Sequence, residues 1–375
     1  MTYTLQKVNL NNPRDVWDFI NLHHRIYRGD KQWIPPLRFE MRHLLSKRRN
    51  PFFAHSDAGF FIVRDQSGKT VSRLACLNNS RFNAHNKEST AFFYLFESEN
   101  IPEASTMVFE GAADWARKQG LNTIIGPKGF TPLDGLGLLT EGFNQPQVFG
   151  IPYNPPYYPA LIEEAGFTST NRILSGTVDR QTSINPKIEQ IARRVRERIG
   201  LEIITLKTKK QIRDYWPIVL ELYNKAIKGT AGNYPIDARE AKELTRWISW
   251  IADPKLIKII TKNSIPVGFL IVYPDVSEAV RRNKGQLLPL GWLDILSYSR
   301  RTKTVNINGM GIAEEYRGLG VTAVLFSEII KSIYESRYTK GELIQVDMDN
   351  EKMLMELRNI GVKYHKKHQL YLKHL

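Results

Sequence analysis

The sequence predicts a mixed α/β fold that is built twice from the same succession of strands and helices. The chain has 375 residues, and the usual size of a domain makes two domains the expected number. Strand-like apolar runs and amphipathic helical stretches follow one another in a similar order in both halves. Two segments support an internal repeat, because each has an Asn, a helical stretch, a Gly and then a strand. They lie at 153–167 and 349–362.

In the first half, apolar runs between turn-forming residues indicate strands, and apolar residues at helical spacing indicate helices. Gly120 and Gly166 each follow a helical stretch, a position typical of a helix end. Cys76 lies in a strand-like run and is predicted to be a core residue. Strands are expected at 59–65, 72–77, 90–97, 121–125 and 167–178, and helices at 104–119 and 158–165.

The second half shows a comparable order after three additional helices. The Asn185-Pro186 pair and the loss of apolar periodicity around it indicate a boundary near 182–186. We therefore predict a first domain at 1–182 and a second domain at 183–375, with an insertion at 275–303. Helices are expected at 186–200, 208–228, 237–252, 321–336 and 351–359, and strands at 256–261, 267–273, 304–312, 343–348 and 362–372.

The composition limits the cellular setting and the class of partner. No apolar run approaches the ~20 residues that a membrane-spanning helix needs, and the N-terminal residues show no apolar signal region. With one cysteine in the chain, these features predict a cytoplasmic protein. The formal net charge is +15. That charge suits an anionic cofactor, an anionic membrane surface or nucleic acid, although basic clusters are also common on solvated faces.

The most informative stretch is Val-Asn-Ile-Asn-Gly-Met-Gly-Ile-Ala-Glu-Glu-Tyr-Arg-Gly-Leu-Gly-Val-Thr at 305–322. It predicts a strand, a glycine-containing turn and the N-terminus of a helix. Backbone N–H groups at such a terminus have no partner within the helix, and the helix dipole adds positive character. Gly318 and Gly320 allow the backbone to approach a ligand closely. A diphosphate is the ligand that this arrangement predicts.

The same stretch resembles the pyrophosphate motif of GNAT acyl-CoA N-acyltransferases, Gln/Arg-x-x-Gly-x-Gly/Ala. Arg317 and Gly320 match that motif, whereas Thr322 stands where the family has Gly or Ala. Asn350 matches the Asn that commonly precedes the last GNAT helix. The resemblance implies an acetyl-CoA or longer acyl-CoA as donor. It also implies that the cofactor-binding residues are Met310, Gly311, Ile312, Arg317, Gly318, Leu319, Gly320, Val321, Thr322 and Asn350.

Segments along the whole chain, among them Trp33-Ile34-Pro35-Pro36-Leu37, resemble a bacterial family with two tandem GNAT domains. In the first half, the turn before the helix is Glu97-Ser98-Glu99-Asn100-Ile101-Pro102. It has neither Arg nor Gly, and its two carboxylates would repel a diphosphate. We therefore expect the N-terminal domain to be a degenerate copy that helps to form the acceptor pocket.

Acyl transfer to an amine needs a proton acceptor. Asp347 and Asp349 follow the strand after the motif and are the candidate bases. Many family members use a Tyr on the last helix as the acid, but Leu357 occupies that position here, so Tyr364 is the candidate in its place. Adjacent His23 and His24 make a poor chelate, as do His365 and His368 in a strand. The sequence therefore indicates no metal site.

The favoured function is an acyl-CoA-dependent N-acyltransferase acting on a primary amine, with long-chain and lipid amines among the acceptors. One alternative takes the acyl group from an aminoacyl-tRNA, and another is a non-catalytic CoA-binding module. The intact motif favours CoA, and nucleic acid is not the expected partner. The insertion at 275–303 carries apolar residues among basic ones, which also suits contact with an anionic membrane.

Overall fold

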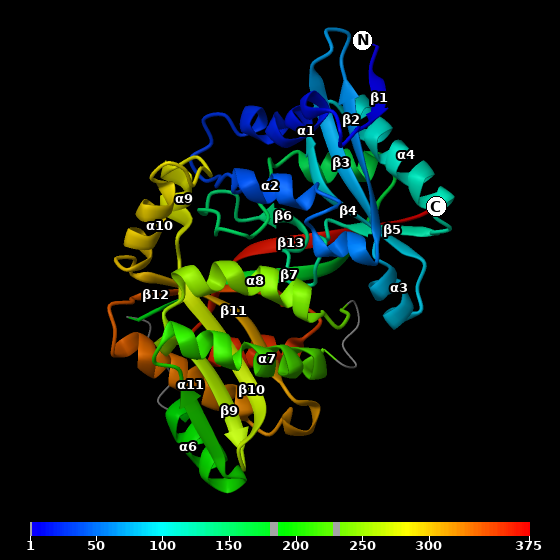
Figure 1. The fold of residues 1–375 in the computed structure, drawn as a ribbon. Coiled ribbons are helices and arrows are strands. Elements are labelled where there is room, and N and C mark those ends of the chain that lie inside the picture. The colour runs from blue at the N-terminus through cyan, green and yellow to red at the C-terminus, as the bar shows by residue number, and fades with distance from the viewer. Residues whose placement is uncertain (1, 181–186, 228–232) are drawn as a thin grey trace. The chain divides into compact units, whose positions relative to one another are not determined.

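A computed structural model of the chain describes residues 2–180, 187–227 and 233–375 (Figure 1). The predicted boundary at 182–186 lies outside the described residues. The first part of the chain forms β1 (Thr4–Lys7), α1 (Pro13–Ile26), α2 (Arg38–Leu44), η1 (Pro51–Ala54), β2 (Asp57–Arg64), β3 (Thr70–Asn78), α3 (Ser80–Asn86), β4 (Thr90–Ser98), α4 (Pro102–Lys118), β5 (Thr123–Gly126), β6 (Leu138–Glu141), α5 (Tyr158–Glu164) and β7 (Thr168–Asp179).

The rest of the described chain contains the motif strand β11 and the helix α11 that follows it. Its elements are α6 (Lys187–Ile199), β8 (Leu201–Thr205), α7 (Lys209–Ala226), α8 (Ala238–Ile251), η2 (Pro254–Leu256), β9 (Ile257–Lys262), β10 (Ile265–Pro274), α9 (Ser277–Arg282), α10 (Gly291–Ser299), β11 (Thr304–Ile312), η3 (Glu314–Tyr316), α11 (Val321–Tyr334), β12 (Lys340–Asp347), α12 (Glu351–Asn359) and β13 (Lys363–His374).

The chain folds into two compact units that exchange short segments of sequence. Unit 1 comprises Met1–Ile173, Val280–Leu287 and Lys366–Leu375, and unit 2 comprises Leu174–Ala279 and Leu288–His365. Strands β7 and β13 therefore contribute residues to both units. The division of the two repeats at 182/183 stays a prediction, as does the insertion at 275–303, which forms α9 and α10.

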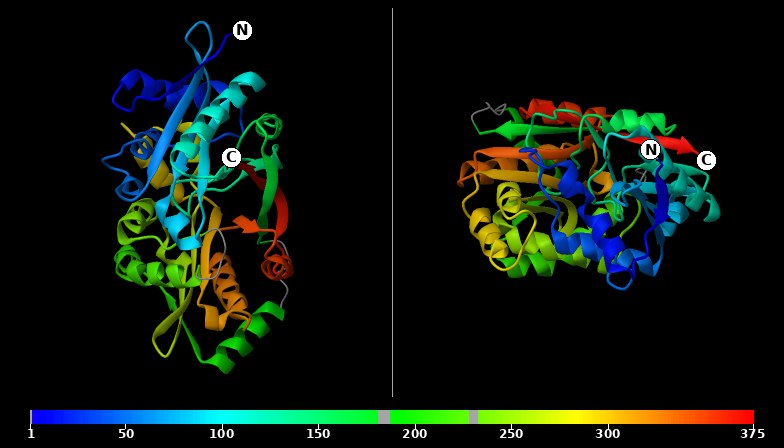
Figure 2. Two further views of the ribbon diagram at one scale, coloured as in Figure 1. Left: turned by 90° about the vertical axis from the view of Figure 1, so that its right-hand side faces the viewer. Right: turned by 90° about the horizontal axis from the view of Figure 1, so that it is seen from above.

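In unit 1, a mixed sheet carries helices on both faces. Its strand order is β1-β2-β3-β4-β5-β13, and only β4 and β5 are parallel among these pairs. Helix α4 covers one face, where Phe93 and Phe109 meet in the core. Helix α1 covers the other face (Figure 2). There, Arg73 of β3 donates a hydrogen bond to the carbonyl of Ile20. Cys76 is buried in the core, as the sequence predicts.

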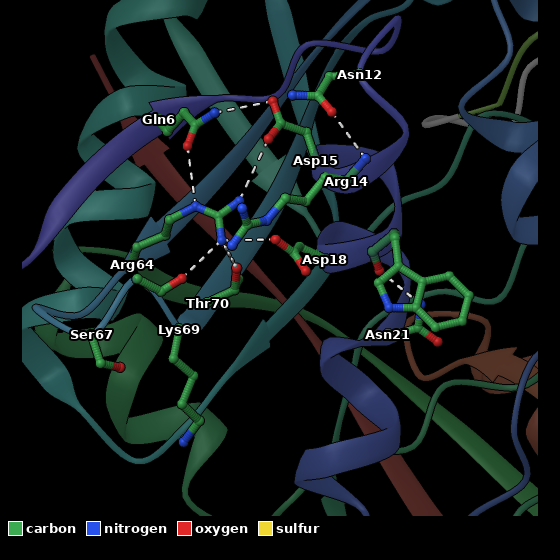
Figure 3. A network of polar contacts seen from close by, with 12 residues as sticks. Gln6, Asn12, Arg14, Asp15, Asp18, Asn21, Arg64, Ser67, Lys69 and Thr70 are labelled. Atoms are coloured by element: carbon green, nitrogen blue, oxygen red, sulfur yellow. Dashed lines mark hydrogen bonds and ion pairs between the residues drawn. The ribbon is translucent and has the colours of Figure 1, made fainter.

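A charged cluster ties α1 to the β1–β2 edge of unit 1 (Figure 3). Arg64 on β2 forms ion pairs with Asp18 at 2.8 Å and Asp15 at 3.5 Å, and its Nε donates to Gln6 at 3.2 Å. Asp15 is 4% exposed, so its charge needs this partner. Removing one member of a buried pair typically costs about 3–5 kcal/mol, because the other charge is left uncompensated. The cluster therefore holds the first helix in place.

In unit 2, the strand order is β7-β12-β11-β10-β9-β8. Residues of α6, α11 and α12 share one core with β9, β10, β11 and β12, among them Val195, Leu325 and Leu357. Helix α7 packs through Ile212, Val219 and Leu222 on a second core with β9 and β10. The two cores lie on opposite faces of the sheet (Figure 1). Among the described residues, no helix is both long and apolar enough to cross a membrane.

Candidate functional site

Strands β11 and β12 of unit 2 run parallel but pair over only four residues. The register begins at Thr304 with Lys340 and ends at Ile307 with Leu343. β11 continues to Ile312 and β12 to Asp347, yet the described chain shows no pairing between these continuations. Backbone N–H and C=O groups on the facing edges are therefore available to an extended ligand that adds itself as a strand.

A β-bulge in β11 marks the point where the two strands separate. Ile307 pairs with Val272 of β10, whereas Met310 pairs with Leu270. Asn308 and Gly309 together therefore oppose one residue of β10, which is the pattern of a bulge. Gly309 has φ +105°, a conformation that residues with side chains rarely adopt. A bulge bends its strand, which is consistent with the loss of pairing to β12 from this point.

The turn between β11 and α11 presents consecutive backbone N–H groups. Gly318 and Gly320 adopt the left-handed conformation, with φ of +75° and +88°. Gly320 is the N-cap of α11, and no side chain caps the first turn of that helix. In the described chain, the N–H groups from Gly318 to Thr322 have no hydrogen-bond acceptor. An anionic oxygen is the partner that this helix terminus favours.

A lysine from the last helix faces the same turn. A Cβ atom built on Gly318 would stand 2.8 Å from Nζ of Lys352, and Lys352 is an exposed residue of α12. An ammonium group beside open N–H groups is a combination that binds phosphate. Sequence reasoning missed Lys352 because only the packing of α12 brings it to the turn. The sequence indicated only that a helix begins after Asn350, and Lys352 lies in the first turn of that helix.

Arg317 and Arg198 hold the turn in place by donating hydrogen bonds to backbone carbonyl groups in and around it. Nε of Arg317 donates to the carbonyl of Ile312 at 3.2 Å, and its Nη2 donates to the carbonyl of Ala226 at the end of α7. Nη2 of Arg198 on α6 reaches the carbonyl of Leu319 at 3.4 Å. Both guanidinium groups thus position the backbone that carries the open N–H groups. The predicted contact of Arg317 with a diphosphate remains a prediction.

The other predicted cofactor residues lie along this backbone. Met310, Gly311 and Ile312 pair with β10 on one side, so their remaining edge faces the gap toward β12. A Cβ on Gly311 would stand 2.5 Å from the ring of Phe269, which explains the glycine there. The remaining members differ in exposure: Val321 is buried, Thr322 is half-buried and Leu319 is exposed.

The predicted catalytic residues and Asn350 have structural contacts at the start and end of α12. Oδ1 of Asn350 accepts from the N–H of Met353 at 3.2 Å and caps the helix. Oδ1 of Asp347 accepts from the N–H of Asp349 at 2.9 Å, and both aspartates are exposed. The hydroxyl of Tyr364 donates to the carbonyl of Leu354 at 3.3 Å, and burial raises the pKa of that tyrosine. Their catalytic roles stay predictions.

Leu357 shows why a tyrosine is missing from the last helix. Its side chain is 1% exposed and packs in the core that α11 shares with the sheet. A tyrosine hydroxyl in that apolar core would lack a hydrogen-bond partner. The described residues contain no group of three or more His, Cys, Asp or Glu that could hold a metal ion.

In unit 1, the parallel strands β4 and β5 and the turn before α4 have different contacts. These strands pair from Thr90 to Phe92, and the N–H of Lys128 then donates to the carbonyl of Phe93 at 2.9 Å. This hydrogen bond continues the contact beyond the last β4–β5 pair, whereas β11 and β12 show no hydrogen bond beyond their last pair among the described residues. Before α4, the carboxylate of Glu99 pairs with Arg25 at 3.0 Å and with Lys69 at 2.9 Å. The turn before α4 thus carries paired carboxylates and lacks the two left-handed glycines of the turn in unit 2.

Two curated bacterial proteins resemble the chain along its length. YghO of Escherichia coli is 25% identical over 371 residues, covering 97% of this chain and 94% of the relative. The bacterial ceramide synthase of Caulobacter vibrioides is 24% identical over 387 residues, covering 99% of this chain and 98% of the relative. No protein-family model matches the chain.

The solved structures establish the fold. A tandem GNAT protein from the clavulanic acid biosynthesis pathway superposes with a TM-score of 0.56 at 12% identity. The alignment covers 100% of this chain and 98% of that protein. The chain therefore has the tandem GNAT fold, and the mixed α/β class that the sequence predicts is confirmed.

Free CoA should raise the Tm of the wild-type protein, and Leu319→Glu should remove that shift. Leu319 is 42% exposed and its backbone lies outside the left-handed region, so the new carboxylate repels the diphosphate without straining the turn. Lys352→Ala should weaken CoA binding about tenfold, the contribution of one charge-assisted contact. Thermal melts across a CoA titration measure both effects.

The control is Lys331→Ala, which removes a lysine from the other end of α11 and should leave the CoA shift intact. Gly320→Glu is unsuitable, because a Cβ there would stand 2.8 Å from Cγ2 of Val195 and disturb the fold. A full shift in Leu319→Glu, or an equal loss in the control, would contradict this location of the site.

Proposed function

We propose that this chain is an acyl-CoA-dependent N-acyltransferase that moves an acyl group from CoA to a primary amine. The main observation behind this proposal is that the open N–H groups of residues 318–322 follow strand β11. Beyond Ile307, the edge of β11 that faces β12 is unpaired. The N–H groups suit a diphosphate. The strand edge suits the amide-bearing arm that links the diphosphate to the thioester in CoA.

Each part of the site has a defined task in this proposal. The bound thioester supplies the activated acyl group. The N–H groups of the turn and Nζ of Lys352 hold the diphosphate, while the free edge of 310–312 aligns the pantetheine arm. Backbone N–H groups on that edge stabilise the carbonyl oxygen as it gains negative charge. The sequence offers Asp347, Asp349 and Tyr364 as candidates for proton transfer, and all three have structural contacts at the ends of α12.

Long-chain primary amines are the acceptors that we propose. The similarity to a bacterial ceramide synthase covers 99% of the chain, and that relative's name refers to a lipid amide. Unit 2 also exposes a cluster of large apolar side chains, described below. Both observations support an acceptor with an apolar tail.

Two alternatives make different predictions. A transferase that uses aminoacyl-tRNA would need a surface for nucleic acid, for which the net charge of +15 is suitable. A CoA-binding module without catalysis would agree with the absence of a tyrosine at Leu357. The open phosphate turn in unit 2 favours CoA over tRNA as the donor.

The purified protein should release CoA from palmitoyl-CoA or acetyl-CoA when dodecylamine is added, and Leu319→Glu should lower this rate because the donor is held less tightly. A thiol reagent measures the product. The protein's single thiol, Cys76, is 0% exposed and burial raises its pKa, so its background reaction should be slow.

CoA binding without amine-dependent CoA release would favour the non-catalytic alternative. Tight tRNA binding that weakens steeply with added salt, together with no CoA-induced Tm shift, would favour the tRNA-dependent alternative. A stirred sample with dodecylamine but no protein gives the uncatalysed rate for subtraction.

We also propose that unit 2 docks on an anionic membrane through an apolar cluster at the start of α10. The cluster consists of Leu288, Leu290, Trp292 and Leu293, which are 77%, 66%, 36% and 45% exposed. Four such side chains within six residues form an unusual concentration on a protein surface. Arg300, Arg301 and Lys303 follow it and are also exposed. Apolar side chains beside cations suit the interface of an anionic bilayer.

Leu288→Glu combined with Leu290→Glu should abolish sedimentation with phosphatidylglycerol vesicles, because charge opposes insertion and repels the lipid. Ile265→Glu provides a matched control, since Ile265 is 65% exposed in the hairpin between β9 and β10. Equal sedimentation of all three proteins, or equal binding to neutral phosphatidylcholine vesicles, would contradict this docking surface.

A further inference from the structure

A buried polar cluster in unit 2 lies outside the predicted catalytic set. Nε2 of His365 on β13 is 2.9 Å from Oε1 of Glu342 on β12. Glu342 is 4% exposed and Asn306 on β11 is 1% exposed. Nδ2 of Asn306 donates to Oδ1 of Asp275 at 3.2 Å. Burying charged and amide groups costs free energy unless they are paired or hydrogen-bonded, and such groups concentrate at functional sites.

The position of this cluster relates it to the gap between β11 and β12. Asn306 and Glu342 are register partners, one position before the pairing ends at Ile307 and Leu343. Ile307 and Leu343 belong to the core beneath α11. Because side chains alternate along a strand, Asn306 and Glu342 project from the opposite face of the sheet. The cluster therefore lies where the strands diverge, on the face away from α11.

Buried polar atoms on Asn306 and His365 lack a hydrogen-bond partner among the described residues. Oδ1 of Asn306 and Nδ1 of His365 are buried and accept or donate no hydrogen bond. Such atoms are uncommon in native structures and call for a missing polar group. An amine bound beside the divergence point would supply hydrogen-bond donors, and water would connect it to the imidazole.

Charged or titratable groups on β12, on β13 and after β10 lie near Glu342. His365 faces it from β13, and Nζ of the half-exposed Lys340 on β12 is 3.9 Å from Oε2. Asp275 follows β10. Burial raises the pKa of Asp275 and the charge of Glu342 raises it further, against hydrogen bonds from Ser277 and Asn306. The cluster therefore combines two carboxylates with one imidazole, a set of groups able to exchange a proton.

We infer that Glu342 is the general base that deprotonates the acceptor amine, and that His365 is a positioning residue that relays the proton. This inference rests on the proposed function. It assigns proton transfer to the buried Glu342 and the partly exposed His365 at the start of the gap, rather than to the exposed Asp347 and Asp349 at its open end.

The ammonium gives its first proton to Glu342, from which it passes by way of His365 to bulk water. The neutral amine forms a C–N bond to the thioester carbonyl carbon, giving a tetrahedral intermediate. The C–S bond then breaks, and the CoA thiolate leaves with the second proton from nitrogen. The products are the amide and CoA-SH, with one proton released to water.

Glu342→Gln should lower kcat for CoA release from palmitoyl-CoA with dodecylamine by about 100-fold or more, the usual contribution of a general base. Wild-type kcat should rise with pH and then level off, the profile expected of a reaction that needs a general base. In Glu342→Gln, kcat should keep rising over the same range, because only the increasing fraction of neutral amine helps. His365→Gln should lower kcat less and displace the point where the profile levels off.

The matched control is Glu202→Gln, the same substitution at an exposed residue of β8, which should retain the wild-type rate and pH profile. A CoA-induced Tm shift verifies that each variant is folded and binds donor. If wild-type protein releases no CoA with any tested pair, the proposed function fails and this inference fails with it. An active wild type and a Glu342→Gln variant with unchanged kcat or pH profile would overturn the inference alone.

Discussion

The interruption of pairing between β11 and β12 is the constraint on which the candidate site depends. Parallel strands normally satisfy each other's backbone groups along their shared length. Here the pairs end at Ile307 and Leu343, and the bulge at Asn308–Gly309 coincides with that point. The strand edge beyond it can accept an extended ligand, and the chain leads from that edge directly into the phosphate turn.

The two units differ in the hydrogen bonds that follow the last pair of their parallel strands. In unit 1, the N–H of Lys128 bonds to Phe93 beyond the last β4–β5 pair, and Glu99 before α4 is already paired with cations. In unit 2, the equivalent gap has no such bond, and Lys352 adds positive charge. The differences support a division of labour in which unit 2 binds the acyl donor.

Much of this architecture could be predicted from local patterns. The strand at 304–312, the helix after Gly320 and the helix started by Asn350 agree closely with the structure. Helices α1, α2 and α3 were not predicted, although Asn12 with Pro13 begins α1 and Asn79 begins α3, both of which are local helix-start signals. The roles of Lys352 and of the Glu342–His365 pair depend on packing between distant segments. Arg317 matches a family motif in sequence, yet its contacts to Ile312 and Ala226 appear only in three dimensions.

A crystal structure with a non-hydrolysable palmitoyl-CoA analogue would test the central claim most directly. We expect density for the diphosphate at the N–H groups of residues 318–322 and beside Lys352. The pantetheine arm should lie along 310–312, between the unpaired parts of β11 and β12. Density for the analogue in unit 1, or a diphosphate bound away from the turn in unit 2, would contradict the account.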